Sequence, residues 1–119
     1  MNENIAWFDE PEKHNYPAAE SYLSLIFKKK KVKKIVKALK KADMNIFKAK
    51  DIFRASELNL LGVSNSHVEK NNIKIKNNQK LSPILLYRYD NKVIIVDGYH
   101  RMCAVYGYNE DSLIPCKII

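Results

Sequence analysis

The residues best suited to chemistry lie together in one segment, Asp97-Gly98-Tyr99-His100-Arg101. The segment follows the apolar run 93–96 and precedes a stretch with helical spacing, so the sequence predicts a buried strand that passes directly into a helix. The first turn of such a helix presents free backbone N–H groups and the positive end of the helix dipole, and both attract anions. Gly98 allows a ligand to come close or φ to be positive.

The side chains of this turn add hydrogen-bond donors. Arg101 can hold a phosphate through two parallel N–H bonds, and His100 can donate to it or move a proton near neutral pH. Asp97 could hold a magnesium ion through water or orient His100. A plainer interpretation also stands: Asp97 is an ordinary N-cap, Gly98 an ordinary turn residue, and His100 and Arg101 are exposed residues of the first turn.

The positive charge of the chain is concentrated in one stretch. The net charge is +8, and residues 28–42 alone hold nine lysines and no acidic residue. Within this stretch Val32, Ile35, Val36 and Leu39 recur at helical spacing, which predicts one apolar stripe on a cationic helix. Residues 18–42 therefore read as one long or two short amphipathic helices. In the first part, Ala18, Tyr22, Leu25 and Ile26 form the expected apolar face.

The rest of the chain alternates short strand and helix signals. The expected elements are a strand at 44–48, a helix at 50–56, a helix at 66–77 capped by Asn65-Ser66, strands at 84–89 and 93–96 joined by a tight turn, a helix from Tyr99 that stops at Gly107, and a last strand at 113–119. A boundary near 42–45 divides a helical N-terminal extension, residues 1–44, from an α+β module, residues 45–119.

Composition excludes several classes of protein. With 46% hydrophobic and 29% charged residues the chain is globular, and no apolar run approaches the length of a membrane helix. The acidic N-terminus and the two cysteines, Cys103 and Cys116, lead us to expect a cytoplasmic protein with reduced thiols and no membrane partner. The three histidines show no metal-ligand spacing, so we expect no metal site.

The stretch from Leu81 to Ile119 carries three motifs in order: Ser82-Pro83-Ile84, Gly98 to Arg101, and Ile114-Pro115. With this arrangement it resembles the ParB/sulfiredoxin superfamily, and a weaker likeness reaches back to Ile46. The resemblance implies a small mixed β-sheet with packed helices. It also implies a nucleoside triphosphate with Mg²⁺ at the glycine turn, and Lys80 and Ser82 as further contacts.

The sequence also departs from the named branches of that superfamily. Sulfiredoxin carries a catalytic cysteine directly before the His-Arg pair, where this chain has Tyr99, so we do not expect sulfinic acid reduction. Partition-type ParB proteins use a Glu-Arg-Arg turn and continue into a DNA-reading helix-turn-helix domain, whereas this chain ends at Ile119, so we do not expect sequence-specific DNA binding. Serine kinases of the superfamily have an Asp-Gly-His-His-Arg turn, which is closer to residues 97–101.

Two functions of different class remain, and the sequence leaves open whether the chain is an enzyme. The first is a nucleotide-binding module, with slow nucleotide hydrolysis or phosphoryl transfer as its candidate activities. In it Gly98, Tyr99, His100 and Arg101 hold the phosphates, Arg101 neutralises charge, His100 relays a proton and Asp97 positions magnesium or water.

The second function is a non-enzymatic nucleic-acid-associated or protein-interaction module. Its affinity comes from the basic helix through Lys28, Lys29, Lys30, Lys31, Lys33, Lys34 and Lys37. A ParB-like nuclease is a further alternative, which would both bind nucleic acid and act as an enzyme, although the sequence shows no paired carboxylates for a catalytic metal. A homodimer through exposed aromatic residues near Trp7 also stays open.

Overall fold

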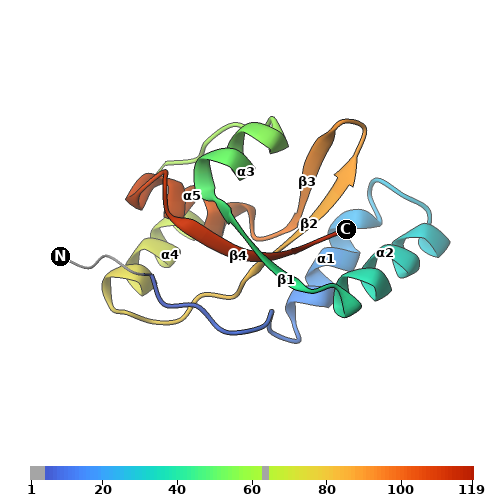
Figure 1. Cartoon of the computed structure of the whole chain (residues 1–119), viewed down its shortest axis with the longest axis horizontal. Helices are drawn as coiled ribbons and strands as arrows, with labels where there is room; N and C mark the ends of the chain where they lie inside the picture. Colours follow the sequence, from blue (N-terminus) through green and yellow to red (C-terminus); the bar gives the residue numbers. More distant parts are fainter. Residues whose placement is uncertain (1–4, 63–64) are drawn as a thin grey trace.

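The computed structural model describes residues 5–62 and 65–119 (Figure 1). These residues form five helices and four strands. In chain order they are α1 (Asn15–Leu23), α2 (Lys29–Lys41), β1 (Met44–Lys48), α3 (Ala49–Ser56), α4 (Ser66–Lys76), β2 (Ile84–Tyr89), β3 (Lys92–Asp97), α5 (Tyr99–Tyr108) and β4 (Leu113–Ile118). The α+β class and the small mixed sheet expected from the sequence are confirmed.

The four strands form one sheet in the order β1-β4-β2-β3. The β4 strand runs antiparallel to β1 and parallel to β2, and β2 and β3 form an antiparallel hairpin. The hairpin turns at Asp90 and Asn91, which have φ values of 55° and 62°. Positive φ at both central residues is the geometry of the short hairpin turns that match the twist of the strands.

Helices cover both faces of the sheet, which explains the uninterrupted apolar runs 84–86 in β2 and 93–96 in β3. Leu85, Ile94 and Val96 pack against α1 and α2 on one face. Ile84, Leu86 and Ile95 point to the opposite face and pack against α3, α4 and α5. The alternation follows from the two-residue period of a strand, so β2 and β3 each contribute to two separate cores.

The α2 helix buries the stripe predicted from its sequence, because Val32, Ile35, Val36 and Leu39 are all in the core beneath it. The predicted apolar face of the preceding helix was wrong. The α1 helix buries Ala19 and Leu23, while Leu25 lies beyond its end and is 85% exposed. The four residues expected on that face are all exposed, namely Ala18, Tyr22, Leu25 and Ile26.

Two predicted helix ends had different outcomes. Asn65 caps α4 as expected, since its Oδ1 accepts hydrogen bonds from the backbone N–H groups of His67 and Val68 at 3.0 and 3.2 Å. The stop at Gly107 was wrong, because α5 continues to Tyr108. The helix ends at Asn109, whose backbone is extended and whose carbonyl accepts the N–H of Ser112 at 2.9 Å. The turn that follows the helix thus sets its end.

The N-terminal part is tied to the sheet at two places. Backbone hydrogen bonds join Phe8 and Ala6 to Leu81, directly before β2. Lys117 on β4 is buried, and its Nζ donates to the carbonyl of Lys40 at 2.9 Å and lies 3.4 Å from a carboxylate oxygen of Glu10. The division of the chain at residues 44 and 45 stays a prediction, and residues 1–4 of the proposed extension lie outside the described residues.

Candidate phosphate-binding site and basic helix

The turn between β3 and α5 requires glycine for the fold itself. Gly98 has a φ of 111° and is the N-cap residue of α5. A Cβ at this position would lie 2.3 Å from Cγ2 of Ile84, which is far inside van der Waals contact. Both the backbone conformation and the packing against β2 therefore exclude a larger residue. The same geometry sets the direction in which the first turn of α5 presents its N–H groups.

No side chain caps the start of α5. The first N–H groups of a helix have no partner within the helix, so they stay available to a ligand or to water. The α4 helix differs, since the side chain of Asn65 already satisfies two of its N–H groups. Of these two helix starts, α5 offers the more open anion-binding position.

Asp97 and Arg101 form an ion pair across the first turn of α5. Nη2 of Arg101 lies 2.9 Å from Oδ2 of Asp97, and the two side chains are 17% and 15% exposed. The same Nη2 also lies 3.4 Å from the carbonyl oxygen of Pro83, and Nε is buried with no partner among the described residues. The carboxylate of Asp97 thus fixes Arg101 rather than capping the helix.

His100 lies against His67, a residue that the sequence did not connect to the turn. The two imidazole rings have their centroids 4.9 Å apart, with a tilt of 43°. Burial lowers the pKa of His100 below its ordinary value, and the nearby His67 and Arg101 lower it further. His100 is therefore neutral near pH 7, where it can both donate and accept a proton. The contact also brings the starts of α4 and α5 together.

Tyr99 ties the turn to the segment between α3 and α4. Its hydroxyl donates to the carbonyl oxygen of Asn59 at 2.6 Å, and burial raises the pKa of the phenol. The sulfur of Cys103, one helical turn further on, is 3.5 Å from the backbone N–H of Leu61. These bonds hold residues 59–61 beside α5.

Lys80 and Ser82 contact the N-terminal segment. The Ser82 hydroxyl donates to a carboxylate oxygen of Glu12. Nζ of Lys80 lies 5.7 Å from the ring centroid of Phe8. Trp7, considered above as a dimer contact, is partly buried against the core. The two residues that the resemblance added to the site thus have other partners in this structure.

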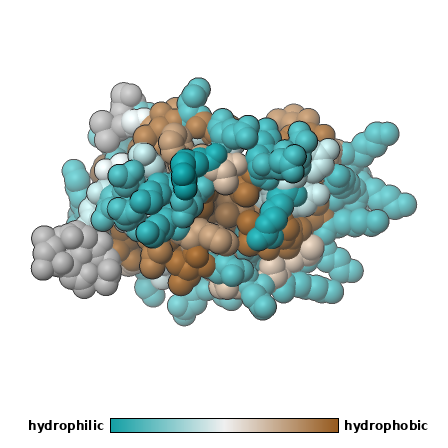
Figure 2. Space-filling model, turned by 45° about the horizontal axis from the view of Figure 1, so that its top comes forward, coloured by the Kyte–Doolittle hydropathy of each residue, from teal (hydrophilic) through white to brown (hydrophobic). Residues whose placement is uncertain are grey.

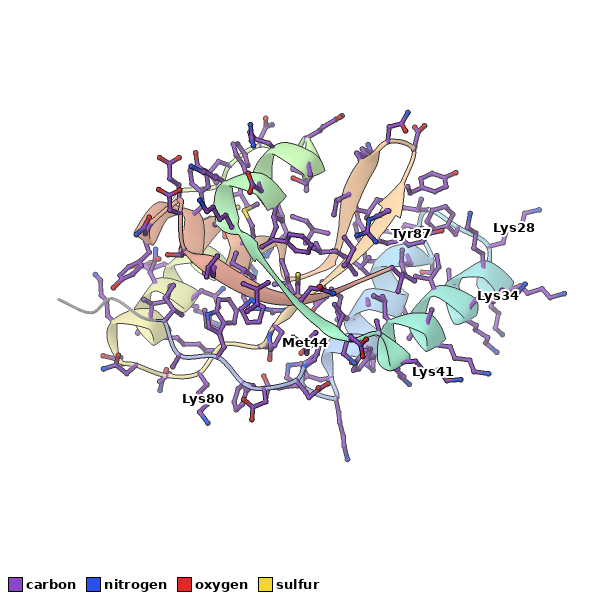
Figure 3. All side chains as sticks on the ribbon, in the orientation of Figure 1. Lys28, Lys34, Lys41, Met44, Lys80 and Tyr87 are labelled. Carbon is purple, nitrogen blue, oxygen red and sulfur yellow. The ribbon has the colours of Figure 1, made fainter. Side chains whose placement is uncertain are left out.

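The basic helix presents all of its lysines to solvent because its apolar stripe is buried. Lys28 to Lys31, Lys33, Lys34, Lys37, Lys40 and Lys41 are exposed, and the labelled side chains of Lys28 and Lys34 project outward (Figure 3). In the space-filling view the hydrophilic side chains extend from the end of the molecule that carries α2 (Figure 2).

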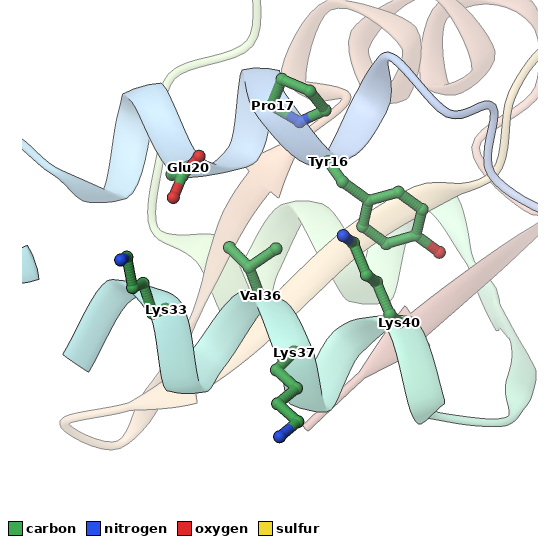
Figure 4. Close-up of a pocket in the computed structure, with 7 residues that line it drawn as sticks. All are labelled: Tyr16, Pro17, Glu20, Lys33, Val36, Lys37 and Lys40. Atoms are coloured by element: carbon green, nitrogen blue, oxygen red, sulfur yellow. The ribbon is translucent and has the colours of Figure 1, made fainter. Parts of the chain in front are cut away.

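A hollow of about 250 Å³ lies between α1 and α2 (Figure 4). Lys33 and Lys40 border it together with Tyr16 and Glu20. Nζ of Lys40 lies 5.6 Å from the centroid of the Tyr16 ring, and Lys37 points away from α1. The lysines of α2 thus face more than one side, as expected for a helix that offers an extended charged surface rather than one closed site.

In the described part of the chain, no three histidine, cysteine or acidic side chains lie close enough together to bind a metal ion. Cys103 and Cys116 are buried free thiols. None of the described helices is long and apolar enough to cross a bilayer.

Comparison of the chain with protein-family models, with curated proteins and with solved structures gives no match. The ParB/sulfiredoxin resemblance therefore stays a prediction.

Proposed function

We propose that this chain is a phosphate-binding module of the ParB/sulfiredoxin kind, and that its ligand is a nucleotide held at the start of α5. The observation that carries the proposal is the uncapped first turn of α5 beside the paired imidazoles of His67 and His100. Free N–H groups, a helix dipole and imidazole donors all favour negative charge at one place. The positive φ of Gly98, which its packing against Ile84 requires, sets the backbone conformation from which the first turn of α5 begins.

Each residue of the turn has a separate role in phosphate binding. The N–H groups of residues 99–101 donate to its oxygens, and the guanidinium of Arg101 neutralises part of its charge. The ion pair with Asp97 fixes Arg101 in place before the ligand arrives, which lowers the entropy lost on binding. His100 supplies a neutral imidazole that donates a hydrogen bond or relays a proton.

The turn suits the phosphate better than it suits a metal ion. It offers one carboxylate, Asp97, whose charge Arg101 already compensates. A magnesium ion in this site would therefore be held mainly by the phosphate oxygens of the nucleotide, as is usual for this hard cation. Asp97, His100 and Arg101 remain the candidate catalytic residues for slow hydrolysis or phosphoryl transfer.

Calorimetric titration tests the proposal. The wild-type protein is titrated with ATP, CTP, GTP and ADP, with and without magnesium, beside His67→Ala, His100→Ala and Arg101→Gln. We expect saturable binding that falls about tenfold or more in Arg101→Gln, because a charge-assisted contact contributes about 1.5–3 kcal/mol. A protein with Lys28 to Lys31 changed to Gln is the control and should bind as the wild type does. If no nucleotide gives a measurable heat of binding, the proposal is wrong.

A second function is supported by a separate observation, the burial of the whole apolar stripe of α2. Because this burial turns every lysine of the helix to solvent, we also propose that α2 binds nucleic acid through its phosphates. Such binding weakens steeply with salt and tolerates Arg101→Gln, whereas loss of Lys28 to Lys31 abolishes it. The two proposals therefore predict opposite responses to the same two variants.

A further inference from the structure

Three aromatic rings lie together beside the start of α2. Phe27, in the loop before α2, makes edge contacts with Tyr87 and Tyr89 of β2, at centroid distances of 5.9 and 4.9 Å. The two tyrosine rings are stacked 6.0 Å apart. Nζ of Lys31 lies 4.5 Å from the Phe27 centroid and 4.8 Å from that of Tyr89. The group therefore joins the hairpin to the basic helix through a preformed set of contacts.

One ring of this group is open to solvent. Tyr89 is 42% exposed and lines an open hollow of about 440 Å³ at the end of the hairpin. Arg88 and Lys92 line the same hollow, and Asp90 is its acidic residue. Arg88 pairs with Val93 and points to the opposite face of the hairpin. We therefore name Phe27, Lys31, Tyr87, Tyr89 and Lys92 the hairpin surface. An exposed ring held by its neighbours, with cations around it, is a suitable platform for a flat aromatic ligand.

The charge next to the hairpin surface favours an anionic partner. Lys28 to Lys31 and Lys34 belong to the stretch 28–42, which contains no acidic residue. Lys31 belongs both to this lysine series and to the aromatic group. A ligand that combines a line of phosphates with flat bases would match the two neighbouring features at once.

We propose that the hairpin surface and the lysines of α2 bind single-stranded nucleic acid, with the phosphates along α2 and a base stacked on Tyr89. This inference rests on the nucleic-acid function proposed for α2. A base can reach the ring only when it is not stacked within a duplex, so the arrangement discriminates between single and double strands. A purely electrostatic surface would bind the duplex at least as well, because the duplex has the higher charge density.

Fluorescence anisotropy with labelled oligonucleotides tests the inference on the full chain. The probes are an oligothymidylate and an oligouridylate of about twelve nucleotides, a duplex of the same length, and polyglutamate as a competitor. Tyr89→Leu keeps an apolar contact for Phe27 and removes the aromatic face, whereas Tyr89→Phe keeps the ring. Tyr108→Ala is the matched control, since Tyr108 has a similar exposure, 41%, and lies at the end of α5.

We expect the single strands to bind more tightly than the duplex, and Tyr89→Leu to weaken single-strand binding at least about fivefold. Tyr89→Phe and Tyr108→Ala should bind as the wild type does. Asp90→Asn should tighten binding, because it removes the negative charge of the hollow while asparagine tolerates the positive φ at this position. The comparison of oligothymidylate with oligouridylate shows whether DNA or RNA is preferred.

Contrary results distinguish failure of single-strand binding from failure of all nucleic-acid binding. If the duplex binds as well as the single strands and Tyr89→Leu has no effect, the single-strand inference is wrong and plain phosphate attraction by α2 remains. If polyglutamate displaces the oligonucleotides at equal charge concentration, the surface is a site for acidic proteins and the inference is wrong as well. If no nucleic acid binds at low salt, the nucleic-acid function of α2 fails with it.

Discussion

Replacement of Gly98 by alanine tests how firmly the α5 turn is fixed by the fold. The new Cβ would lie 2.3 Å from Cγ2 and 2.7 Å from Cβ of Ile84, a fully buried residue at the start of β2. The backbone would also have to keep a φ of 111° with a side chain present. Rotation of a side chain cannot relieve the clash or the backbone strain, because the methyl group of alanine has no rotamers and the branched side chain of Ile84 is enclosed by the core.

The magnitude follows from these two terms. Left-handed backbone costs a residue with a side chain about 1–2 kcal/mol. Excess volume in a packed core costs about 1–3 kcal/mol. Their sum, about 2–5 kcal/mol, is a large fraction of the stability of a domain, which is about 5–15 kcal/mol. With a urea dependence of about 2 kcal/mol per molar, the unfolding midpoint should fall by about 1–2.5 M.

The assay is equilibrium urea unfolding followed by far-ultraviolet circular dichroism, with Gly107→Ala as the matched control. Gly107 lies inside the same helix, and a Cβ there meets no atom within 4 Å. Alanine at 107 should therefore stabilise the protein by about 0.5–1 kcal/mol, because it lowers the entropy of the unfolded chain and favours helix. A Gly98→Ala protein as stable as the wild type, beside a normal control, would refute the packing described for this turn.

Three other changes have defined outcomes. The pKa of His100 is lowered from the ordinary 6.5, so the unfolded chain binds more protons than the folded one as the pH drops below about 6.5. The free energy of unfolding should therefore fall with pH in this range. His100→Gln should flatten this dependence, as measured by urea unfolding at several pH values. Lys117→Met should lower the free energy of unfolding by about 1–3 kcal/mol in the same assay, because it removes the buried hydrogen bond to the Lys40 carbonyl. Lys92→Met, at an exposed position, is the control and should leave the free energy of unfolding nearly unchanged. Burial raises the pKa of the Cys116 thiol to about 12 and also raises the pKa of Cys103. Neither thiol should therefore react with Ellman's reagent near pH 8 until urea unfolds the chain. Rapid reaction of the native protein would contradict the burial of these thiols.

Local sequence signals predicted the elements whose formation depends on near neighbours. The period of Val32 to Leu39, the Asn65 cap and the tight turn between the strands of the hairpin each act within a few residues, and each was confirmed. The turn is one residue shorter than the predicted Asp90-Asn91-Lys92, since β3 begins at Lys92. The pairing of β1 with β4 joins residues 44–48 to residues 113–117. No local pattern encodes a contact over that separation, so the strand order came only from the structure.

The error on α1 shows how tertiary contacts decide between two local solutions. Apolar residues occur at Ala18, Ala19, Tyr22, Leu23, Leu25 and Ile26, which allows more than one helical face. The face that contacts the sheet includes Ala19 and Leu23, with Asn15 buried beside them and its Oδ1 accepting the Glu12 N–H at 2.7 Å. That hydrogen bond offsets the cost of burying an amide, which a hydropathy pattern does not register.

The sequence indicated only some of the contacts that surround the α5 turn. The turn itself was visible because glycine, histidine and arginine follow a buried strand directly. The hydrogen bond from Arg101 to Asp97 was missed, although only three residues separate the end of β3 from this position in the first turn of α5. His67 was missed because it is far from His100 in the sequence, and its only local signal was its place in the first turn after the Asn65 cap.

The central position of β4 also has a consequence for synthesis on the ribosome. This strand lies between β1 and β2, yet it is translated after every other strand of the sheet. Until residue 118 has left the exit tunnel, β1 has no partner and one edge of the β2-β3 hairpin is unpaired. Nascent chains paused before that point expose apolar strand edges, which chaperones and proteases recognise. The sheet can therefore close only when its last strand inserts between β1 and β2.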